Sequence, residues 1–153
     1  MIVRRFEDLV VWQLAVRIKE EVLAIIARRP AANDVKFCDQ IRESARSAPR
    51  NIAEGFGRYY PKEFGRFLRI ALASLHETKN HLHDGHAHRY ITDEEYERLV
   101  RTTLRAIKAG NRLAAYLRTA RPPQPFQQTQ EPPESREPSE PSESSEPSEP
   151  SEP

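Results

Sequence analysis

The amino-acid sequence predicts an all-α protein, an antiparallel up-down four-helix bundle (residues 1–121) followed by a disordered acidic C-terminal tail (residues 122–153). Four stretches of roughly 20 residues repeat apolar side chains at helical spacing, and none shows the alternation of a β-strand. Short loops join these stretches, which favours antiparallel neighbours. After residue 121 the composition changes to a Ser-Glu-Pro repeat that holds ten of the 13 prolines.

The first helix is predicted from about residue 8 to residue 28. Pro30 and the Ala-Ala-Asn that follows end it, because proline cannot continue a helix. Its core-facing row is expected to hold the apolar residues at every fourth position, which are Val10, Leu14, Ile18, Val22 and Ile26.

The second helix is predicted from about residue 37 to residue 56, with Pro49 in its interior. A proline there removes one backbone N–H and clashes with the carbonyl four residues back, so we expect either a kink or neighbouring polar groups that take up the freed carbonyl. Asn51 and Glu54 are assigned to this structural role, and Gly55 and Gly57 are expected to allow close approach or a helix end. The expected core positions are Phe37, Ile41, Ala45, Ala48, Ile52 and Phe56.

The third helix is predicted from Pro61, which suits a first helical turn, to about residue 87. Its expected core positions are Phe64, Phe67, Leu68, Ala71, Leu75, Thr78 and Leu82. The fourth helix begins after Thr92, which forms a predicted capping box with Glu95. Its expected core positions are Tyr96, Leu99, Val100, Thr103, Leu104, Ile107, Leu113, Ala114 and Leu117.

The charge of the chain is divided between the two parts. Residues 122–153 contain eight glutamates and one arginine, a net charge of −7, whereas residues 1–121 contain 23 basic and 15 acidic residues, a net charge of +8. A basic globular domain favours a nucleic acid or another anionic partner. Charges interrupt every apolar run, so we expect neither a signal peptide nor a membrane span, and we expect a cytoplasmic protein.

Basic residues also follow the helical repeat. The fourth helix carries a stripe at spacings of three and four residues, the second carries a shorter ladder, and Lys62, Arg66 and Arg69 follow on the third. A helix surface is often charged only because it meets water, but same-sign neighbours repel by a few tenths of a kcal/mol per pair, which a polyanion would relieve. The candidate nucleic-acid-binding residues on these rows are Arg42, Arg46, Arg50, Arg98, Arg101, Arg105, Lys108 and Arg112.

Five histidines gather near the end of the third helix, and His81, Asp84 and His88 share one face at a spacing that a metal ion accepts. We favour the simpler explanation that these side chains complement the helix C-terminus, and we expect no metal and no cofactor. Cys38 is the only cysteine and has no evident partner base, so we expect it to be a buried filler or cap. With no catalytic constellation in the sequence, we expect no enzymatic activity.

The segment from Gln40 to Arg58, QIRESARSAPRNIAEGFGR, resembles the 23S ribosomal RNA intervening-sequence protein family, whose members carry a run like Q-[IL]-R-R-A-x-V-S-[IV]-P-x-N-I-A-E-G-x-G-R. The resemblance extends over about residues 5–118. Three departures stand out: Glu43 replaces a usual arginine, Arg46 replaces a usual valine, and His88-Arg89 replaces a Leu-Gly-like helix end.

The resemblance implies a four-helix bundle that forms a homopentamer and binds RNA or DNA without catalysis. Carried onto this chain, it implies Arg42, Arg50 and Arg58 as candidate nucleic-acid-binding residues. A similar basic pentamer is the accessory variability protein of diversity-generating retroelements, which binds a reverse transcriptase and nucleic acid. Two hypotheses therefore stay open: an oligomeric bundle that binds structured RNA or DNA, and a scaffold that binds an acidic protein such as a reverse transcriptase. The acidic tail lies outside the resemblance, and either folds back over the basic faces as a phosphate mimic or serves as a solubilising extension.

Overall fold

Four long helices form the body of the chain in a computed structural model, which describes residues 3–58 and 60–120. They are α1 (Val10–Ile26), α2 (Val35–Phe56), α3 (Pro61–Ala87) and α4 (Asp93–Thr119), and two short 3-10 turns, η1 (Phe6–Asp8) and η2 (Ala31–Asn33), flank α1. Within these described ranges there is no β-strand. None of the helices found there is apolar over enough of its length to cross a bilayer.

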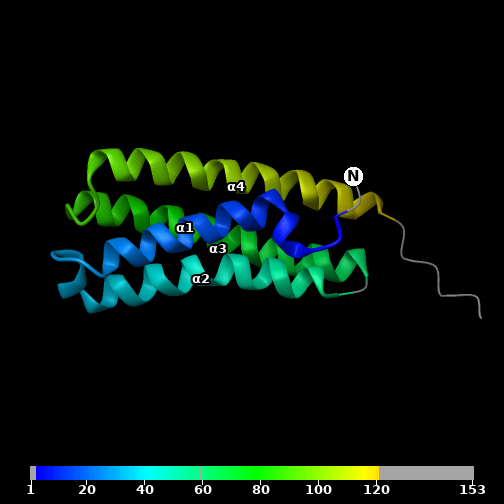
Figure 1. The fold of residues 1–153 in the computed structure, drawn as a ribbon, viewed down its shortest axis with the longest axis horizontal. Helices are drawn as coiled ribbons and strands as arrows, with labels where there is room; N and C mark the ends of the chain where they lie inside the picture. Colours follow the sequence, from blue (N-terminus) through cyan, green and yellow to red (C-terminus); the bar gives the residue numbers. More distant parts are fainter. Residues whose placement is uncertain (1–2, 59, 121–153) are drawn as a thin grey trace, which may run out of the picture. The chain divides into compact units, whose positions relative to one another are not determined.

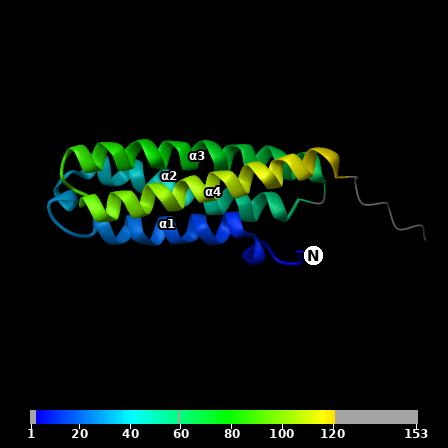
Figure 2. The ribbon, with the colours of Figure 1, turned by 90° about the horizontal axis from the view of Figure 1, so that it is seen from above.

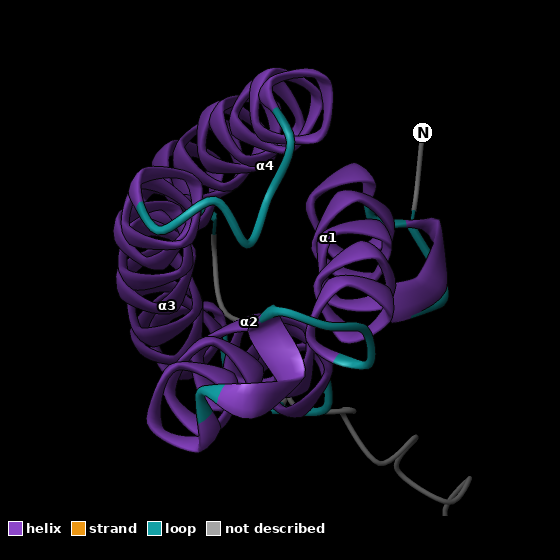
Figure 3. Cartoon of the chain, turned by 90° about the vertical axis from the view of Figure 1, so that its left-hand side faces the viewer, coloured by secondary structure: helices purple, strands orange, loops and turns teal. Residues whose placement is uncertain are grey.

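The helices run alternately up and down and pack in the ring order α1, α2, α3, α4, with α4 closing against α1. Figures 1 and 2 show α4 ending and α3 beginning at the same end of the bundle, and Figure 3 shows the ring viewed along the helices. The predicted up-down bundle is therefore confirmed. The predicted disordered tail concerns residues 122–153, which lie outside the described residues.

The core contains most of the predicted apolar positions, but two predictions were wrong. Val10 is 58% exposed and Leu104 is 47% exposed, whereas the neighbouring Val11 and Thr103 are buried. A row at every fourth position rotates by about 40° per step, because an α-helix has 3.6 residues per turn. The row faces the core at Ile18, but each step toward the N-terminus turns it further around the helix. At Val10 it therefore faces away from the core.

A polar seam joins α2 and α3. Ser44 Oγ lies 3.0 Å from Thr78 Oγ1, and the Ser74 hydroxyl donates to Ser47 Oγ at 2.8 Å. Ser44, Ser74 and Thr78 are buried, and small side chains such as Ala45 and Ala48 lie alongside them in the α2 core. Because each hydroxyl in the seam has a partner, the burial of these polar groups carries little cost.

The helix ends follow local sequence rules. The predicted capping box is confirmed: the Glu95 backbone N–H donates to Thr92 Oγ1 at 3.3 Å, and the Thr92 N–H donates to Glu95 Oε2 at 3.1 Å. At the end of α3, Arg89 adopts a left-handed φ of 60°. The Tyr90 N–H then bonds to the Gly85 carbonyl, and the Arg89 N–H bonds to the His86 carbonyl. This is a Schellman ending with arginine where glycine is usual.

Candidate nucleic-acid interface

The predicted stripe on α4 divides into a paired half and an unpaired half. Arg98 Nε donates to Glu21 Oε2 of α1 at 3.0 Å, and the Arg98 side chain is only 38% exposed. Arg101 Nη1 lies 3.7 Å from Glu97 Oε2 on the surface of α4 itself. An exposed pair of that kind contributes only about 0–1 kcal/mol, so an anionic ligand can displace Glu97.

The C-terminal half of the stripe consists of Arg105, Lys108 and Arg112, which we call the α4 basic cluster. All three side chains are exposed, and none forms an ion pair within the described ranges 3–58 and 60–120. From residue 98 to residue 120 the sequence has six basic residues and no acidic one. The cluster therefore produces a positive surface that no residue of the described part neutralises directly.

The N-terminal half of α3 adds to this positive region. A Cβ on Gly110 would meet Leu72 at 2.7 Å, which fixes the register of the antiparallel α3 and α4. Arg69 precedes Leu72 by three residues and Arg112 follows Gly110 by two, so they lie at the same level along the bundle. Arg69 is exposed and, within the described residues, has no ion-pair partner. The two helices together carry positive charge at the end where α4 stops.

The ladder on α2 is more fully neutralised. Arg42 pairs with Asp39, and Arg50 Nη2 lies 3.2 Å from Glu43 Oε1. Glu43 stands where the family-like run has an arginine. The α2 ladder therefore lacks one positive charge at this position, and the Glu43 carboxylate also neutralises Arg50. Arg46 is exposed and forms no ion pair with any described residue. Of the predicted binding residues in the described part of the chain, one unpaired cation on α2, Arg46, therefore compares with three on α4.

Arg58 lies just beyond α2 and is held by two neighbours. Its Nη2 atom lies 2.7 Å from Glu54 Oε1, and its guanidinium carbon is 5.0 Å from the centre of the Phe67 ring. Glu54 is exposed and faces Arg58 rather than the backbone beside Pro49. These contacts orient Arg58 across the α2–α3 connection and leave it half-exposed.

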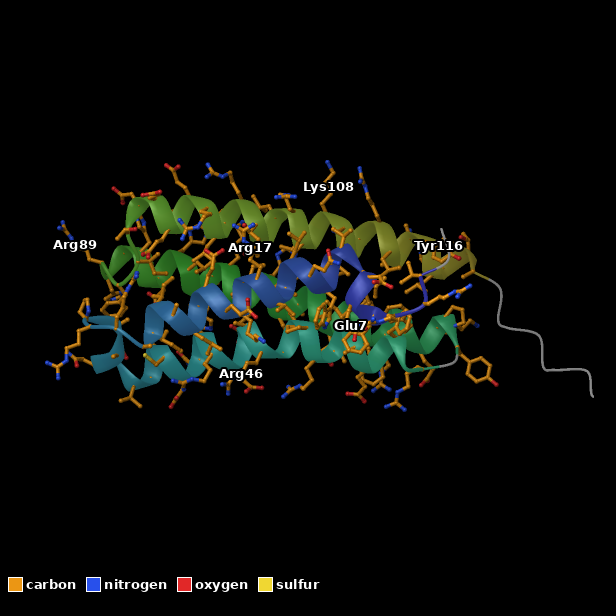
Figure 4. The ribbon with its side chains drawn as sticks, in the orientation of Figure 1. Glu7, Arg17, Arg46, Arg89, Lys108 and Tyr116 are labelled. Carbon is orange, nitrogen blue, oxygen red and sulfur yellow. The ribbon has the colours of Figure 1, made fainter. Side chains whose placement is uncertain are left out.

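The structure does not bring the α2 ladder and the α4 stripe together. In the ring order, α2 and α4 are diagonal and their outer faces point in opposite directions. Figure 4 shows Arg46 and Lys108 on opposite edges of the bundle, both pointing into solvent. One duplex lying on one face cannot contact both surfaces of a single copy.

The residues around Pro49 have structural contacts. Asn51 Nδ2 donates to the Ser47 carbonyl at 2.8 Å and lies 3.1 Å from Ser47 Oγ, which links the proline turn to the α2–α3 seam. Gly55 is buried, and a Cβ there would lie 2.7 Å from atoms of both Phe64 and Phe67. The predicted close approach at Gly55 is therefore present.

His86 and His88 each pair with a different group instead of converging on one point. His86 Nε2 lies 2.7 Å from Asp93 Oδ1, and its ring stacks on Tyr96 at 4.2 Å between centres. His88 Nδ1 lies 2.9 Å from the Asp84 carbonyl, as expected near a helix C-terminus. Across the described residues, no three His, Cys, Asp or Glu side chains form a group that could hold a metal ion.

Cys38 is buried, and its Sγ lies 3.2 Å from the Ala31 carbonyl. Burial raises the pKa of the thiol above its ordinary value, since the thiolate would lose hydration. The thiol is therefore kept in its unreactive, protonated form, as expected for a structural position.

Sequence reasoning missed the contact between Glu21 and Arg98, which are 77 residues apart. The sequence holds a weak signal, since Glu21 lies beside the buried Val22 and Ile18. Knowing which helix faces Glu21 requires knowing that α4 closes the ring against α1. Arg118, a further exposed cation in the last turn of α4, was also missed.

The sequence of residues 7–111 matches the family described as 23S rRNA-intervening sequence protein. The fold is similar to a crystal structure of a protein of unknown function from the S23 ribosomal protein family of Bacteroides thetaiotaomicron. That similarity has a TM-score of 0.61 at 22% identity, and it covers 71% of this chain and 99% of the other. No curated protein matches the chain significantly.

Proposed function

We propose that this chain, which belongs to the 23S rRNA-intervening sequence protein family, is a non-enzymatic helical bundle that binds RNA or DNA through basic helix faces. The α4 basic cluster of Arg105, Lys108 and Arg112 is the observation that carries the proposal. We assign these residues to phosphate contacts, which give affinity and salt dependence but no sequence recognition.

The geometry of the cluster supports this assignment. Residues spaced by three and four along a helix lie about 5 Å apart along its axis, and double-stranded DNA carries one charge per about 1.7 Å of its axis. A row of three cations therefore meets several phosphates at once. If the cluster neutralises three phosphates, the logarithm of the association constant should fall with the logarithm of salt concentration, with a slope of about −2.7.

Binding of structured RNA and duplex DNA to the full chain, titrated across salt concentrations, tests the proposal. The variant Arg105→Gln/Arg112→Gln should bind more weakly and should lower the magnitude of the slope by about 2. The matched control is Arg46→Gln/Arg50→Gln, which removes two charges from the opposite face. Binding that is negligible, or equally sensitive to both pairs of substitutions, would contradict the assignment to α4.

A second candidate function is suggested by Leu104, which is 47% exposed between Arg101 and Arg105. An exposed leucine among arginines suits a protein partner with an acidic rim around an apolar centre. In this alternative the chain is an accessory protein for a partner such as a retroelement reverse transcriptase. Leu104→Ala should then weaken the protein complex at high salt and leave nucleic-acid binding unchanged.

We also propose that the protein acts in the cytoplasm as a homo-oligomer, with five copies as the family resemblance implies. Because α2 and α4 present charge on opposite faces, one copy cannot pool them on one ligand. Neighbouring copies in a ring can instead present several α4 basic clusters to one ligand, and linked weak sites then gain avidity. Sedimentation equilibrium of the full chain measures the number of copies.

A further inference from the structure

We propose that the α4 nucleic-acid site takes a single-stranded segment of RNA or DNA, with an unpaired base stacked on the ring of Tyr116. This ligand class rests on the function proposed above, because the α4 basic cluster holds the phosphates and Tyr116 adds a contact to the base. Three features of Tyr116 carry the inference: the exposure of its ring, the direction of its side chain and the cations that precede it on α4.

Tyr116 presents an aromatic ring that the bundle itself does not use. It is 67% exposed, the largest exposed fraction of any aromatic residue in the part of the chain that the structure describes. Within that part its ring contacts no other ring, and its hydroxyl has no hydrogen-bond partner. By contrast, the aromatic side chains that contact another ring or a guanidinium are Phe6, Trp12, Phe37, Phe56, Phe64, Phe67, Tyr90 and Tyr96.

The helical repeat explains why this ring is exposed. Eighteen residues complete five turns of an α-helix, so Tyr116 leaves α4 in the same direction as Arg98, which meets Glu21 of α1 at 3.0 Å. A Cβ on Gly110 would lie 3.3 Å from Val11 Cγ2, near the start of α1. Because α1 and α4 are antiparallel, Tyr116 lies about 9 Å past that level, where α1 has not begun. The side of α4 that α1 covers at Arg98 is therefore uncovered at Tyr116.

Two cations of the α4 basic cluster lie on the same side of the helix as this ring. Arg112 precedes Tyr116 by four residues and Arg105 precedes it by eleven, which keeps the three side chains within about 40° of one another around the axis. Along the axis the two arginines lie about 6 Å and about 16 Å from Tyr116. Figure 4 shows Tyr116 on α4 beyond Lys108, toward the end of the helix. The row therefore combines positive charge with a flat aromatic surface.

A nucleotide carries the two groups that this row fits, which are a phosphate and a flat ring. Arginine binds phosphate oxygens, and an aromatic side chain stacks on any base, because every base has a π-face. In a duplex the faces of a base are covered by its neighbours in the stack, so a ring on a protein surface stacks on an unpaired base. An acidic peptide would satisfy the arginines but would leave the Tyr116 ring uncovered.

The stacking contact is assigned to this chain and not to its family. Arg112 and Tyr116 lie outside residues 7–111, which match the family, whereas Arg105 and Lys108 lie within them. The phosphate contacts and the base contact therefore belong to different parts of α4, and substitutions separate them.

Binding of the full chain to a single-stranded oligonucleotide, and to the duplex of the same sequence, tests the proposal at low salt. Tyr116→Ala should weaken single-strand binding about tenfold, or about 1.4 kcal/mol, which is within the range for base–aromatic stacking. Duplex binding should not change. The slope of single-strand binding against salt should also be unchanged, because the substitution removes no charge.

Two further substitutions at the same position control for the loss of side-chain volume. Tyr116→Phe keeps the aromatic ring and should bind the single strand as the original chain does. Tyr116→Leu keeps an apolar side chain and a good helix former but has no aromatic face, so it should bind as weakly as Tyr116→Ala. If Tyr116→Leu binds as tightly as Tyr116→Phe, the contact is apolar packing and the stacking is wrong.

Photochemical cross-linking locates the base without relying on affinity. An oligonucleotide with one iodouracil forms a covalent bond, on irradiation, with an aromatic side chain stacked on that base. Peptide mapping should place the cross-link on Tyr116, and its yield should fall severalfold in Tyr116→Leu. A cross-link that maps to another residue, with the same yield in Tyr116→Leu, would place the base elsewhere and overturn the proposal.

The outcomes separate this proposal from the function proposed above. If the full chain binds neither the single strand nor the duplex at low salt, the proposed function fails and the ligand class falls with it. If both bind with a steep salt dependence and Tyr116→Ala changes neither, the function stands and the stacking is wrong. If Tyr116→Ala lowers the number of copies in sedimentation equilibrium and leaves single-strand binding unchanged, the ring packs against a second copy and the stacking is again wrong.

Discussion

Arg98 Nε donates to Glu21 Oε2 at 3.0 Å, so the first cation of the α4 stripe holds α4 against α1 instead of facing solvent freely. Both side chains are less than half exposed. The pair divides the stripe functionally, because a ligand must break it before it can use Arg98. The α4 basic cluster requires no such rearrangement.

We expect Arg98→Gln to lower the free energy of unfolding by no more than about 1 kcal/mol and to leave the salt dependence of nucleic-acid binding unchanged. Arg105→Gln should leave the free energy of unfolding unchanged and lower the magnitude of the salt-dependence slope of nucleic-acid binding by about 0.9. Thermal unfolding and salt-titrated binding of the two variants measure both effects. If Arg98→Gln weakens binding as much as Arg105→Gln does, Arg98 contacts the ligand.

Arg89→Gly should stabilise the protein. Arg89 holds a left-handed φ of 60° at the end of α3, a conformation that costs an L-residue roughly 1–2 kcal/mol and costs glycine little. Because glycine also has a more flexible unfolded state, we expect a net gain of about 0.5–1 kcal/mol in urea unfolding. Arg89→Ala keeps the penalty while removing the charge, so a similar gain in that control would show that the effect is electrostatic.

Gly55→Ala should destabilise the bundle by about 1–3 kcal/mol, the usual cost of overpacking. The added Cβ would lie 2.7 Å from Phe64 Cδ2 and from Phe67 Cβ, and the latter atom moves only with the α3 backbone. Gly65→Ala is the matched control, because nothing lies within 4 Å of the Cβ added there. It should stabilise α3 by up to about 1 kcal/mol. Equal effects of the two substitutions would contradict the close packing of α2 and α3.

The stability of the bundle should fall in acid through Glu95. A hydrogen bond from Arg28, together with the capping contacts at Thr92, lowers the pKa of Glu95 below its ordinary value of 4.5. A lowered folded-state pKa contributes stability above the unfolded-state value, and this stability is lost as the pH falls below about 4.5 through the folded-state pKa.

Glu95→Gln isolates that contribution. Glutamine keeps the capping hydrogen bond but loses the charge that faces Arg28, so we expect a loss of about 1 kcal/mol at pH 7. The difference should shrink as the pH falls below about 4.5. Urea unfolding across this pH range measures the difference, and a difference that is constant with pH would contradict the charged pairing.

Much of the bundle can be predicted from the sequence because its signals are local. Thr92 and Glu95 are three residues apart, so their reciprocal cap is readable without knowing the fold. The helical spacing of apolar residues around Ile18 and Val22 is enough to identify the buried side of α1. The same period misplaces Val10 and Leu104, because it gives the direction of the apolar face but not how far the neighbouring helices cover it.

The candidate site is harder to predict because it depends on what lies opposite each cation. Five basic residues on α4 look equivalent in sequence, yet only packing distinguishes Arg98, which meets Glu21, from Arg105, which meets solvent. Whether Arg46 and Lys108 can serve one ligand depends on the ring order of the helices, and no spacing in the sequence encodes it.

The hydroxyl contacts between α2 and α3 also bear on the axial register of the two helices. Ser44 meets Thr78 and Ser47 meets Ser74 at one register only. Displacing α3 by one helical turn, about 5.4 Å, would break both contacts and leave at most one new hydroxyl pair, Ser44 with Ser74 or Ser47 with Thr78. The two contacts together therefore favour a single axial register of α2 and α3, and with it one relative position of the charges that the two helices carry.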